Sequence, residues 1–132
     1  MVDYNAYKAH LTEIYQAEID MLAKRFGPTA QVVDTGGGCM AIEAVIGDAP
    51  GSGHPLLLLI TTIDNGLAEG REDILHWYAC VYDTVDTSDA IADGHDLQSF
   101  EMAYEVALAH MRDGVPASDE LCSCFLVGES ER

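Results

Sequence analysis

Basic residues are scarce in this chain. It holds six lysines and arginines against 23 aspartates and glutamates in 132 residues, which gives a formal net charge of −17. Without a basic patch to displace the counterions of a phosphate backbone, direct binding to nucleic acid is not expected. An anionic membrane surface would repel the chain for the same reason. The sequence therefore predicts neither nucleic acid nor a membrane as a direct partner.

Long hydrophobic runs are also missing. The longest strongly apolar stretch, Leu56 to Ile60, has five residues, whereas a transmembrane helix needs about 20. The first residues show no basic segment followed by an apolar one, as a secretory signal would. Hydrophobic residues still make up 48% of the chain, enough for a core, so disorder is not expected. We expect a cytoplasmic protein with one domain over residues 1–128 and a frayed end at 129–132.

Sequence motifs for catalysis and cofactor binding are missing as well. The glycines at 36–38 are followed by Cys39 rather than by the Lys-Ser/Thr of a phosphate-binding loop. None of the five histidines is followed by another four positions later. Residues 89–100 fail the calcium-loop pattern, because its third and twelfth positions would be Ile91 and Phe100. The sequence therefore predicts no catalytic residue, no metal site and no cofactor. A small enzyme or ligand-binding domain is the third functional alternative, after the two binding functions given below.

Four cysteines are present, at positions 39, 80, 122 and 124. In a reducing compartment we expect them to be free, buried thiols. Cys122 and Cys124 are separated by one residue, whereas zinc ligands usually have two to four residues between them. A zinc site made of these two thiols and a histidine is therefore the less favoured alternative.

Two long helices are predicted from apolar residues that recur every three or four positions. The first covers residues 3–26, with Asp3 as its N-cap and Gly27-Pro28 as its stop. The second covers residues 96–113, with Asp96 as its N-cap and a Gly-Val-Pro stop.

Between the helices, three segments predict strands, after a short extended stretch at 31–34. Residues 39–46 and 75–82 alternate between two faces, and residues 56–63 form a short apolar run of β-compatible residues. Residues 83–95 are predicted as an acidic loop, and residues 121–127 as a short edge strand or a docked tail. The predicted fold class is a two-layer α+β domain of order α-β-β-β-α, with an antiparallel sheet of three or four strands and two long helices.

This element order resembles that of double-stranded-RNA-binding domains, but the basic loops with which those domains contact RNA are missing here. The order, size and acidity also resemble the dimeric chaperones that hold type III secretion effectors. The second resemblance implies a dimer that holds a client segment.

The negative charge is unevenly distributed. Residues 1–28 hold four acids and three bases, whereas residues 83–120 hold ten acids and only Arg112. We interpret the second segment as an acidic face that binds a protein partner with a basic surface. The predicted partner-binding residues are Asp83, Asp86, Asp89, Asp93, Asp96, Glu101 and Glu105. Solubility, or adaptation to high salt, would give the same acidity and stays open as an explanation.

The function predicted first is that of a non-enzymatic binding or inhibitory module. Small acidic inhibitors of nucleic-acid-handling enzymes share this charge, including phage proteins that act against host defence and imitate nucleic acid; the analogy is one of charge. The alternative is a dimeric chaperone- or adaptor-like protein that holds a client segment on an apolar surface.

The predicted strands are apolar on both faces, which indicates a homodimer. A sheet covered by helices on one side should carry polar residues on the other. Two helices packed side by side cover one face, and the second would leave aromatic and aliphatic surface exposed. The predicted dimer interface consists of Trp77, Tyr78, Tyr82, Leu57 and Leu59.

Overall fold

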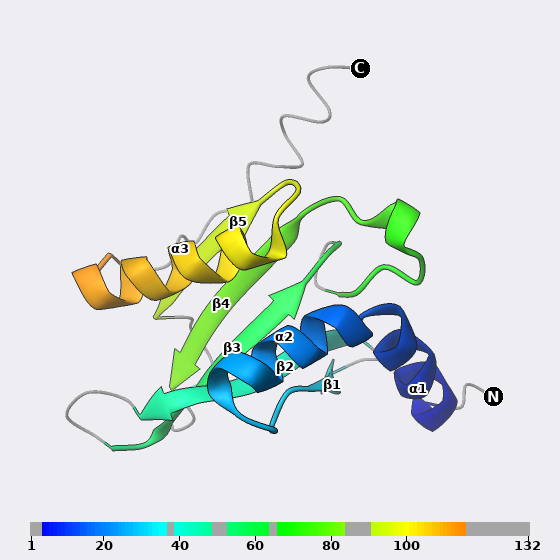
Figure 1. Ribbon diagram of the computed structural model, residues 1–132, viewed down its shortest axis with the longest axis horizontal. Coiled ribbons are helices and arrows are strands. Elements are labelled where there is room, and N and C mark those ends of the chain that lie inside the picture. Colours follow the sequence, from blue (N-terminus) through cyan, green and yellow to red (C-terminus); the bar gives the residue numbers. More distant parts are fainter. Residues whose placement is uncertain (1–3, 37–38, 49–52, 64–65, 84–90, 116–132) are drawn as a thin grey trace.

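The computed structural model describes residues 4–36, 39–48, 53–63, 66–83 and 91–115 (Figure 1). Its five strands form one antiparallel sheet in the order β1-β2-β3-β4-β5. The elements are α1 (Tyr4–Ile14), α2 (Gln16–Phe26), β1 (Gln31–Gly36), β2 (Cys39–Asp48), β3 (Pro55–Thr61), the 3₁₀ turn η1 (Arg71–Asp73), β4 (Trp77–Asp83), β5 (Ala92–Asp96) and α3 (Phe100–Asp113). The α+β class is confirmed, but the described sheet has five strands rather than three or four. The described residues form three helices rather than two. The order of elements therefore differs from the α-β-β-β-α order on which the resemblances to double-stranded-RNA-binding domains and to the dimeric chaperones were based.

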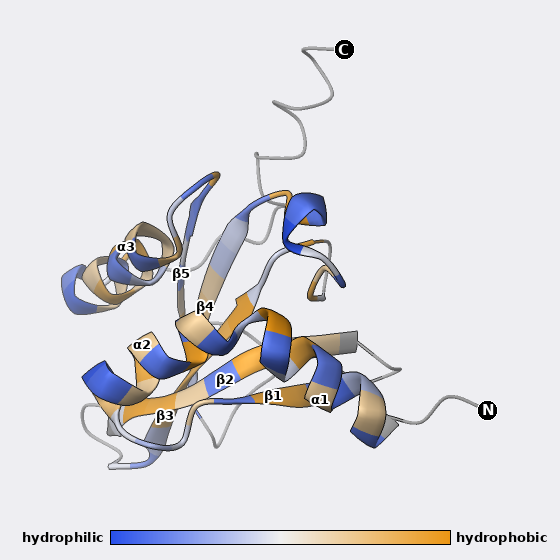
Figure 2. Ribbon diagram, turned by 45° about the vertical axis from the view of Figure 1, so that its right-hand side comes forward, coloured by the Kyte–Doolittle hydropathy of each residue, from blue (hydrophilic) through white to orange (hydrophobic). Residues whose placement is uncertain are grey.

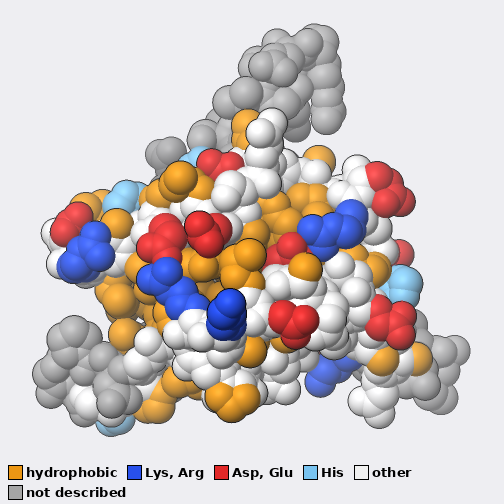
Figure 3. Space-filling view, in the orientation of Figure 1, with side chains coloured by type: hydrophobic (Ala, Val, Ile, Leu, Met, Phe, Trp, Pro, Cys, Tyr) orange, Lys and Arg blue, Asp and Glu red, His pale blue; other side chains and the backbone are white. Residues whose placement is uncertain are grey.

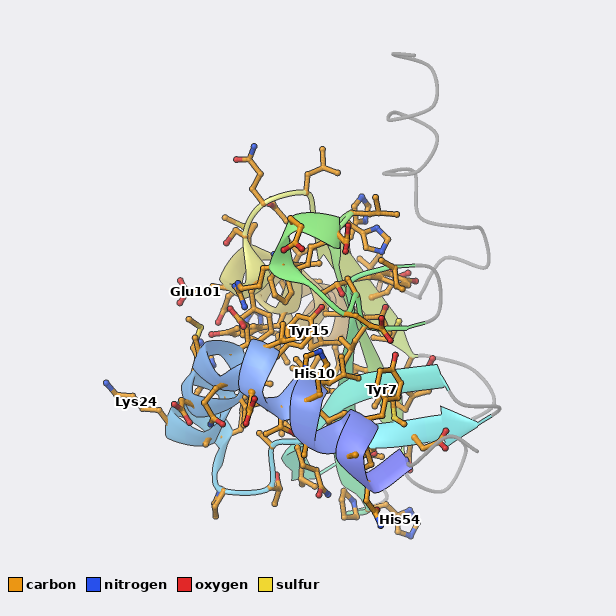
Figure 4. The ribbon with its side chains drawn as sticks, turned by 90° about the vertical axis from the view of Figure 1, so that its right-hand side faces the viewer. Tyr7, His10, Tyr15, Lys24, His54 and Glu101 are labelled. Carbon is orange, nitrogen blue, oxygen red and sulfur yellow. The ribbon has the colours of Figure 1, made fainter. Side chains whose placement is uncertain are left out.

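All three helices lie on one face of the sheet. α3 packs against β4 and β5, α2 against β2, and α1 lies beside β1 at the sheet edge (Figure 1). The view turned by 90° shows helices on one side and strands on the other (Figure 4). The described part of the molecule is therefore a two-layer arrangement, as predicted.

The core lies between these two layers. One row of directly paired strand residues, Val32, Ile42, Ile60 and Ala79, has exposures of 3% or less. The next row, Ala44, Leu58, Val81 and Ala92, is fully buried. The hydropathy colouring shows this apolar band along β2 and β3 (Figure 2). Alternation along each strand then fixes which side chains lie on the opposite face.

The first predicted helix, 3–26, is interrupted at Tyr15. α1 ends at Ile14 and α2 begins at Gln16, although neither glycine nor proline lies nearby. Arg71 donates a hydrogen bond from Nη1 to the carbonyl oxygen of Ile14 at 2.9 Å. A side chain that bonds to a helix carbonyl is a recognised cause of such bends. The bend depends on a residue far along the chain, which helical periodicity does not report.

The predicted acidic loop, 83–95, is wrong in its second half, because residues 92–96 form β5. Ala92 and Gly94 are small residues on the side that faces α3. A strand of small and acidic residues lacks the β-branched and aromatic side chains typical of strands. Its pairing with β4 and its contact with α3 stabilise it instead.

The second long helix begins at Phe100 rather than at Asp96. Ser99 is its N-cap, and its Oγ accepts a hydrogen bond from the Met102 amide at 3.0 Å. Asp96 instead accepts hydrogen bonds from the amides of Gln98 and Ser99. The predicted stops at Gly27 and Gly114 are confirmed.

Some predictions fall outside the described residues. These are the N-cap Asp3, the glycines at 37–38, the acidic residues Asp86 and Asp89, the tail segment 121–127 and the end at 129–132. Within the described segments, no helix is both long and apolar enough to cross a membrane.

Candidate functional site

The sheet face opposite the helices is the candidate binding surface, and we call it the open face. No helix among the described residues covers it (Figure 4). Cross-strand pairing places the following residues on it: Gln31 and Val33 of β1; Ala41, Glu43 and Val45 of β2; Leu57, Leu59 and Thr61 of β3; Tyr78, Cys80 and Tyr82 of β4; and Asp93 and His95 of β5.

One straight row of paired residues crosses the open face. Glu43 pairs with Leu59, Leu59 with Cys80, and Cys80 with Asp93. Leu59 is half-buried and Cys80 is 9% exposed. The row is thus apolar at Leu59 and Cys80, between the carboxylates of Glu43 and Asp93, and it continues beyond Glu43 to Gln31 of β1.

A second, apolar row runs beside the first. Val45 pairs with Leu57, and Leu57 pairs with Tyr82. All three side chains are half-buried. Together with Leu59 and Cys80 they make the centre of the open face a continuous apolar surface.

Lysine and arginine are missing from all five described strands. The basic residues among the described positions are Lys8, Lys24, Arg25, Arg71 and Arg112, which lie in the helices and in η1. The carboxylates on the open face belong to Glu43 and Asp93, and the five described strands contribute no lysine or arginine to that face. This face combines apolar surface with negative charge.

Tyr78 orients the carboxylate of Asp93. Its hydroxyl donates a hydrogen bond to Oδ2 of Asp93 at 2.8 Å. Burial, followed by the neighbouring Cys80 and Asp93, raises the pKa of Tyr78 far above its ordinary value. The phenol therefore stays protonated at neutral pH and serves as a fixed donor to the carboxylate.

The backbone of Asp93 is fixed by α3. Nδ1 of His110 donates a hydrogen bond to the carbonyl oxygen of Asp93 at 2.7 Å. At the next residue, Gly94, a Cβ atom would lie 2.5 Å from the backbone nitrogen of Ala107 and 2.6 Å from the carbonyl oxygen of Ala103. Only a glycine lets the helix approach the strand this closely. Asp93 is thus held on a rigid part of the fold.

The other predicted acidic residues do not form one surface with Asp93. Asp96 binds the amides before α3, and Glu105 forms an ion pair with Arg25 of α2. Glu101 is exposed on α3 and points away from the sheet (Figure 4). Asp83 lies at the far end of β4, where it pairs with Leu56. Asp86 and Asp89 lie outside the described residues.

The predicted dimer residues are divided between the two faces. Leu57, Leu59, Tyr78 and Tyr82 share the open face. Trp77 faces the helices, is 5% exposed, and has its ring centroid 5.2 Å from that of Phe100. Neighbouring strand residues point to opposite faces, so Trp77 and Tyr78 cannot belong to one surface. Strand alternation missed Glu43 and Cys80 as members of the row, because the register across strands was needed to find them.

The helix side has a different character. Acidic and basic side chains are interspersed over it, with apolar side chains between them (Figure 3). Arg25 pairs with Glu105, and Arg71 pairs with Glu18. The charge of one sign that the sequence predicted for the second helix is thus partly balanced by bases from other elements.

Among the described residues, no group of three histidine, cysteine, aspartate or glutamate side chains is placed to hold a metal ion. Cys122 and Cys124 lie outside those residues. The chain matches no protein-family model, no curated protein and no solved structure.

Proposed function

We propose that the protein is a non-enzymatic binding module whose open face captures a protein partner that is both apolar and basic. The observation that supports this most is the composition of the open face. Its centre is apolar at Leu57, Leu59 and Cys80, and its charged groups are the carboxylates of Glu43 and Asp93.

Burial of the apolar centre would supply the main part of the binding free energy, at about 25 cal/mol per Å² removed from water. The carboxylates would contribute mainly to specificity. A partner with lysine or arginine beside its apolar residues pairs with them, whereas an acidic partner is repelled. The net charge of −17 would also speed the approach of a basic partner.

This proposal keeps the basic partner expected from the sequence and moves the contact from the second helix to the sheet. On the helix side, Asp96 and Glu105 already interact with groups of this chain. On the open face, apolar surface and negative charge occur together, as a specific interface requires.

Binding of three short fluorescent peptides tests the proposal. We expect a peptide of alternating lysine and leucine to bind more tightly than one of lysine and serine, and a peptide of glutamate and leucine to bind least. High salt should weaken the lysine–leucine peptide without abolishing its binding, because salt screens charges but leaves apolar burial intact. Equal binding of the glutamate–leucine peptide, or no binding of any peptide, would contradict the proposal.

A matched pair of variants localises the binding. Leu59→Ser removes an apolar side chain from the centre of the open face and should lower the affinity for the lysine–leucine peptide. Leu97→Ser makes the same change at a side chain that is 51% exposed and lies outside the five strands. Equal effects of the two substitutions would place the binding elsewhere.

A second copy of this chain is the second candidate occupant, and the size of the sheet favours it. Strands lie about 4.8 Å apart and rise about 3.3 Å per residue, so five strands and a seven-residue β3 span roughly 500 Å² in projection. Side chains add to this, towards the ~800 Å² per partner of a stable interface. A dimer in light scattering at micromolar concentration, which the lysine–leucine peptide does not dissociate, would assign the open face to the second copy.

A further inference from the structure

The carboxylates of the open face lie in register on one line. Glu43, Leu59, Cys80 and Asp93 are successive cross-strand partners on β2, β3, β4 and β5. Three inter-strand steps of about 4.8 Å separate the backbone positions of Glu43 and Asp93 by about 14 Å. The line runs across the strands, with apolar side chains between its two carboxylates, and Gln31 of β1 lies beyond Glu43.

An extended chain matches this line in both length and pattern. It rises about 3.4 Å per residue and points every second side chain to the same face, so residues i, i+2 and i+4 share a face over about 14 Å. A straight helix repeats the same face after seven or eleven residues, at about 10 or 16 Å. An extended segment therefore fits both carboxylates and the apolar centre with one short motif.

We infer that the open face recognises an extended segment of the form cation–x–apolar–x–cation, where each cation is a lysine or arginine, laid across the strands. One cation pairs with Asp93, the other with Glu43, and the apolar side chain between them packs on Leu59 and Cys80. The inference rests on the proposed function and adds to it the conformation and the residue spacing of the partner.

Asp93 is the better organised of the two anchors. The Tyr78 hydroxyl holds one carboxylate oxygen, and α3 holds the backbone through His110 and the close approach at Gly94. A carboxylate already fixed in place loses little conformational freedom when a cation binds. Tyr78 is therefore a positioning residue for Asp93.

Charge argues against the two occupants from this chain. Residues 116–132 carry four acids and Arg132 as their one base. A second copy would bring the same two carboxylates to the interface. A basic segment of another protein has the charge opposite to that of the open face. Residues 116–132 and a second copy of the chain are both acidic, so the open face would repel them.

The test compares two peptides of equal composition in identical serine-glycine flanks. In the first, Lys-Ser-Leu-Ser-Lys, all three recognised side chains share one face of an extended chain. In the second, Lys-Leu-Ser-Ser-Lys, the leucine points to the opposite face. We expect the first peptide to bind at least several-fold more tightly to the full chain.

Protein variants then test the two anchors. Glu43→Gln and Asp93→Asn should each weaken the first peptide about two- to fivefold, the usual range for an exposed ion pair. Glu101→Gln removes the same charge from α3 and should change the affinity less than either of them. Tyr78→Phe should lower the affinity for the first peptide. In the Asp93→Asn background the same substitution should lower it by a smaller factor, because Tyr78 acts through Asp93. If Asp93→Asn does not fold, Glu43→Gln alone decides the matter.

The outcomes separate this inference from the proposed function. Binding of the alternating lysine–leucine peptide without any effect of leucine position, Glu43 or Asp93 overturns the inference and leaves the proposed function standing. Absence of binding by all lysine–leucine peptides overturns both. If the protein is then a monomer and Leu59→Ser lowers its melting temperature, residues of its own chain cover the open face; if it is a dimer, a second copy does.

Discussion

The hydroxyl oxygens of Tyr15 and Thr62 lie 2.8 Å apart in the buried interior. Tyr15 donates its proton to the carbonyl oxygen of Ala68 at 2.8 Å, and the Thr62 oxygen accepts from the Ala68 amide at 2.9 Å. These three bonds join the bend between α1 and α2 to the segment that follows β3. They satisfy polar groups that would be costly to bury without partners.

Tyr15→Phe should lower the free energy of unfolding by about 1–2 kcal/mol, because it leaves the Ala68 carbonyl without this donor. Urea unfolding followed by circular dichroism measures the change. Thr62→Val should cost a similar amount. The double variant should cost less than the sum by about 1 kcal/mol, since both substitutions remove the same bond. Strict additivity would mean that the two hydroxyls do not interact.

Gly94→Ala should destabilise the fold by about 1–3 kcal/mol. The new Cβ atom would overlap backbone atoms of Ala103 and Ala107, so α3 would have to move away from β5. Gly70→Ala is the matched control, because its Cβ meets only the flexible end of Glu72. Thermal unfolding of both variants makes the comparison. A loss for Gly70→Ala as large as that for Gly94→Ala would refute the close approach of α3 and β5.

The sequence was sufficient for those features that depend on neighbouring residues. Both glycine stops, the apolar stripes of the helices and the apolar, β-compatible composition of β3 and β4 can be recognised from neighbouring residues, and each of these elements is present in the structure. The bend at Tyr15 depends on Arg71, which lies far along the chain and outside any window of neighbouring residues. The strand β5 depends on its pairing with β4 and its packing against α3, and the small and acidic residues of 92–96 do not indicate either contact.

The candidate surface was predictable in part. The predicted dimer interface contained Leu57, Leu59, Tyr78 and Tyr82, which share the open face, but also Trp77, which faces the helices. The charge count placed the functional acids in the second helix, because a sum over a segment ignores bases that arrive from elsewhere. Arg25 illustrates this, since it belongs to α2 and pairs with an acid of α3. Only the register of the sheet places Glu43 and Asp93 on one line.

Two arginine-to-lysine substitutions should differ sharply in how much they lower the free energy of unfolding. Arg71 donates to both carboxylate oxygens of Glu18, at 2.8 and 3.0 Å, and Glu18 is 7% exposed. Arg71→Lys loses this two-pronged geometry and should cost about 1–2 kcal/mol of stability. Arg25→Lys changes a pair whose two side chains are 45% and 40% exposed, and should cost no more than about 0.5 kcal/mol. Chemical denaturation compares the two, and equal costs would contradict the structural role given to Arg71.

Asp96 should stabilise the start of α3 in a pH-dependent way. The amides of Gln98 and Ser99 lower the pKa of its carboxyl below the ordinary value. Its contribution is therefore complete above the unfolded pKa of about 3.9 and disappears as the pH falls through the lower, folded value. Asp96→Ala should cost about 1 kcal/mol near neutral pH and much less in strong acid. Urea unfolding of both proteins across that range tests this, and a difference in stability that does not change with pH would exclude an ionised Asp96 carboxylate as the acceptor of these two amides.

Tyr78→Phe should make the protein less sensitive to alkaline unfolding. Burial, then the neighbouring Cys80 and Asp93, raise the pKa of Tyr78, so the folded protein keeps a phenol proton that the unfolded chain releases above about pH 10. Because the unfolded state binds fewer protons there, stability falls as the pH rises past this value. The phenylalanine variant lacks that loss, although near neutral pH it should be about 1 kcal/mol less stable, since Asp93 loses its donor. The two stability curves should therefore approach each other at alkaline pH. Parallel curves for wild type and variant would mean that Tyr78 ionises normally and that the open face does not hold it beside Asp93 as described.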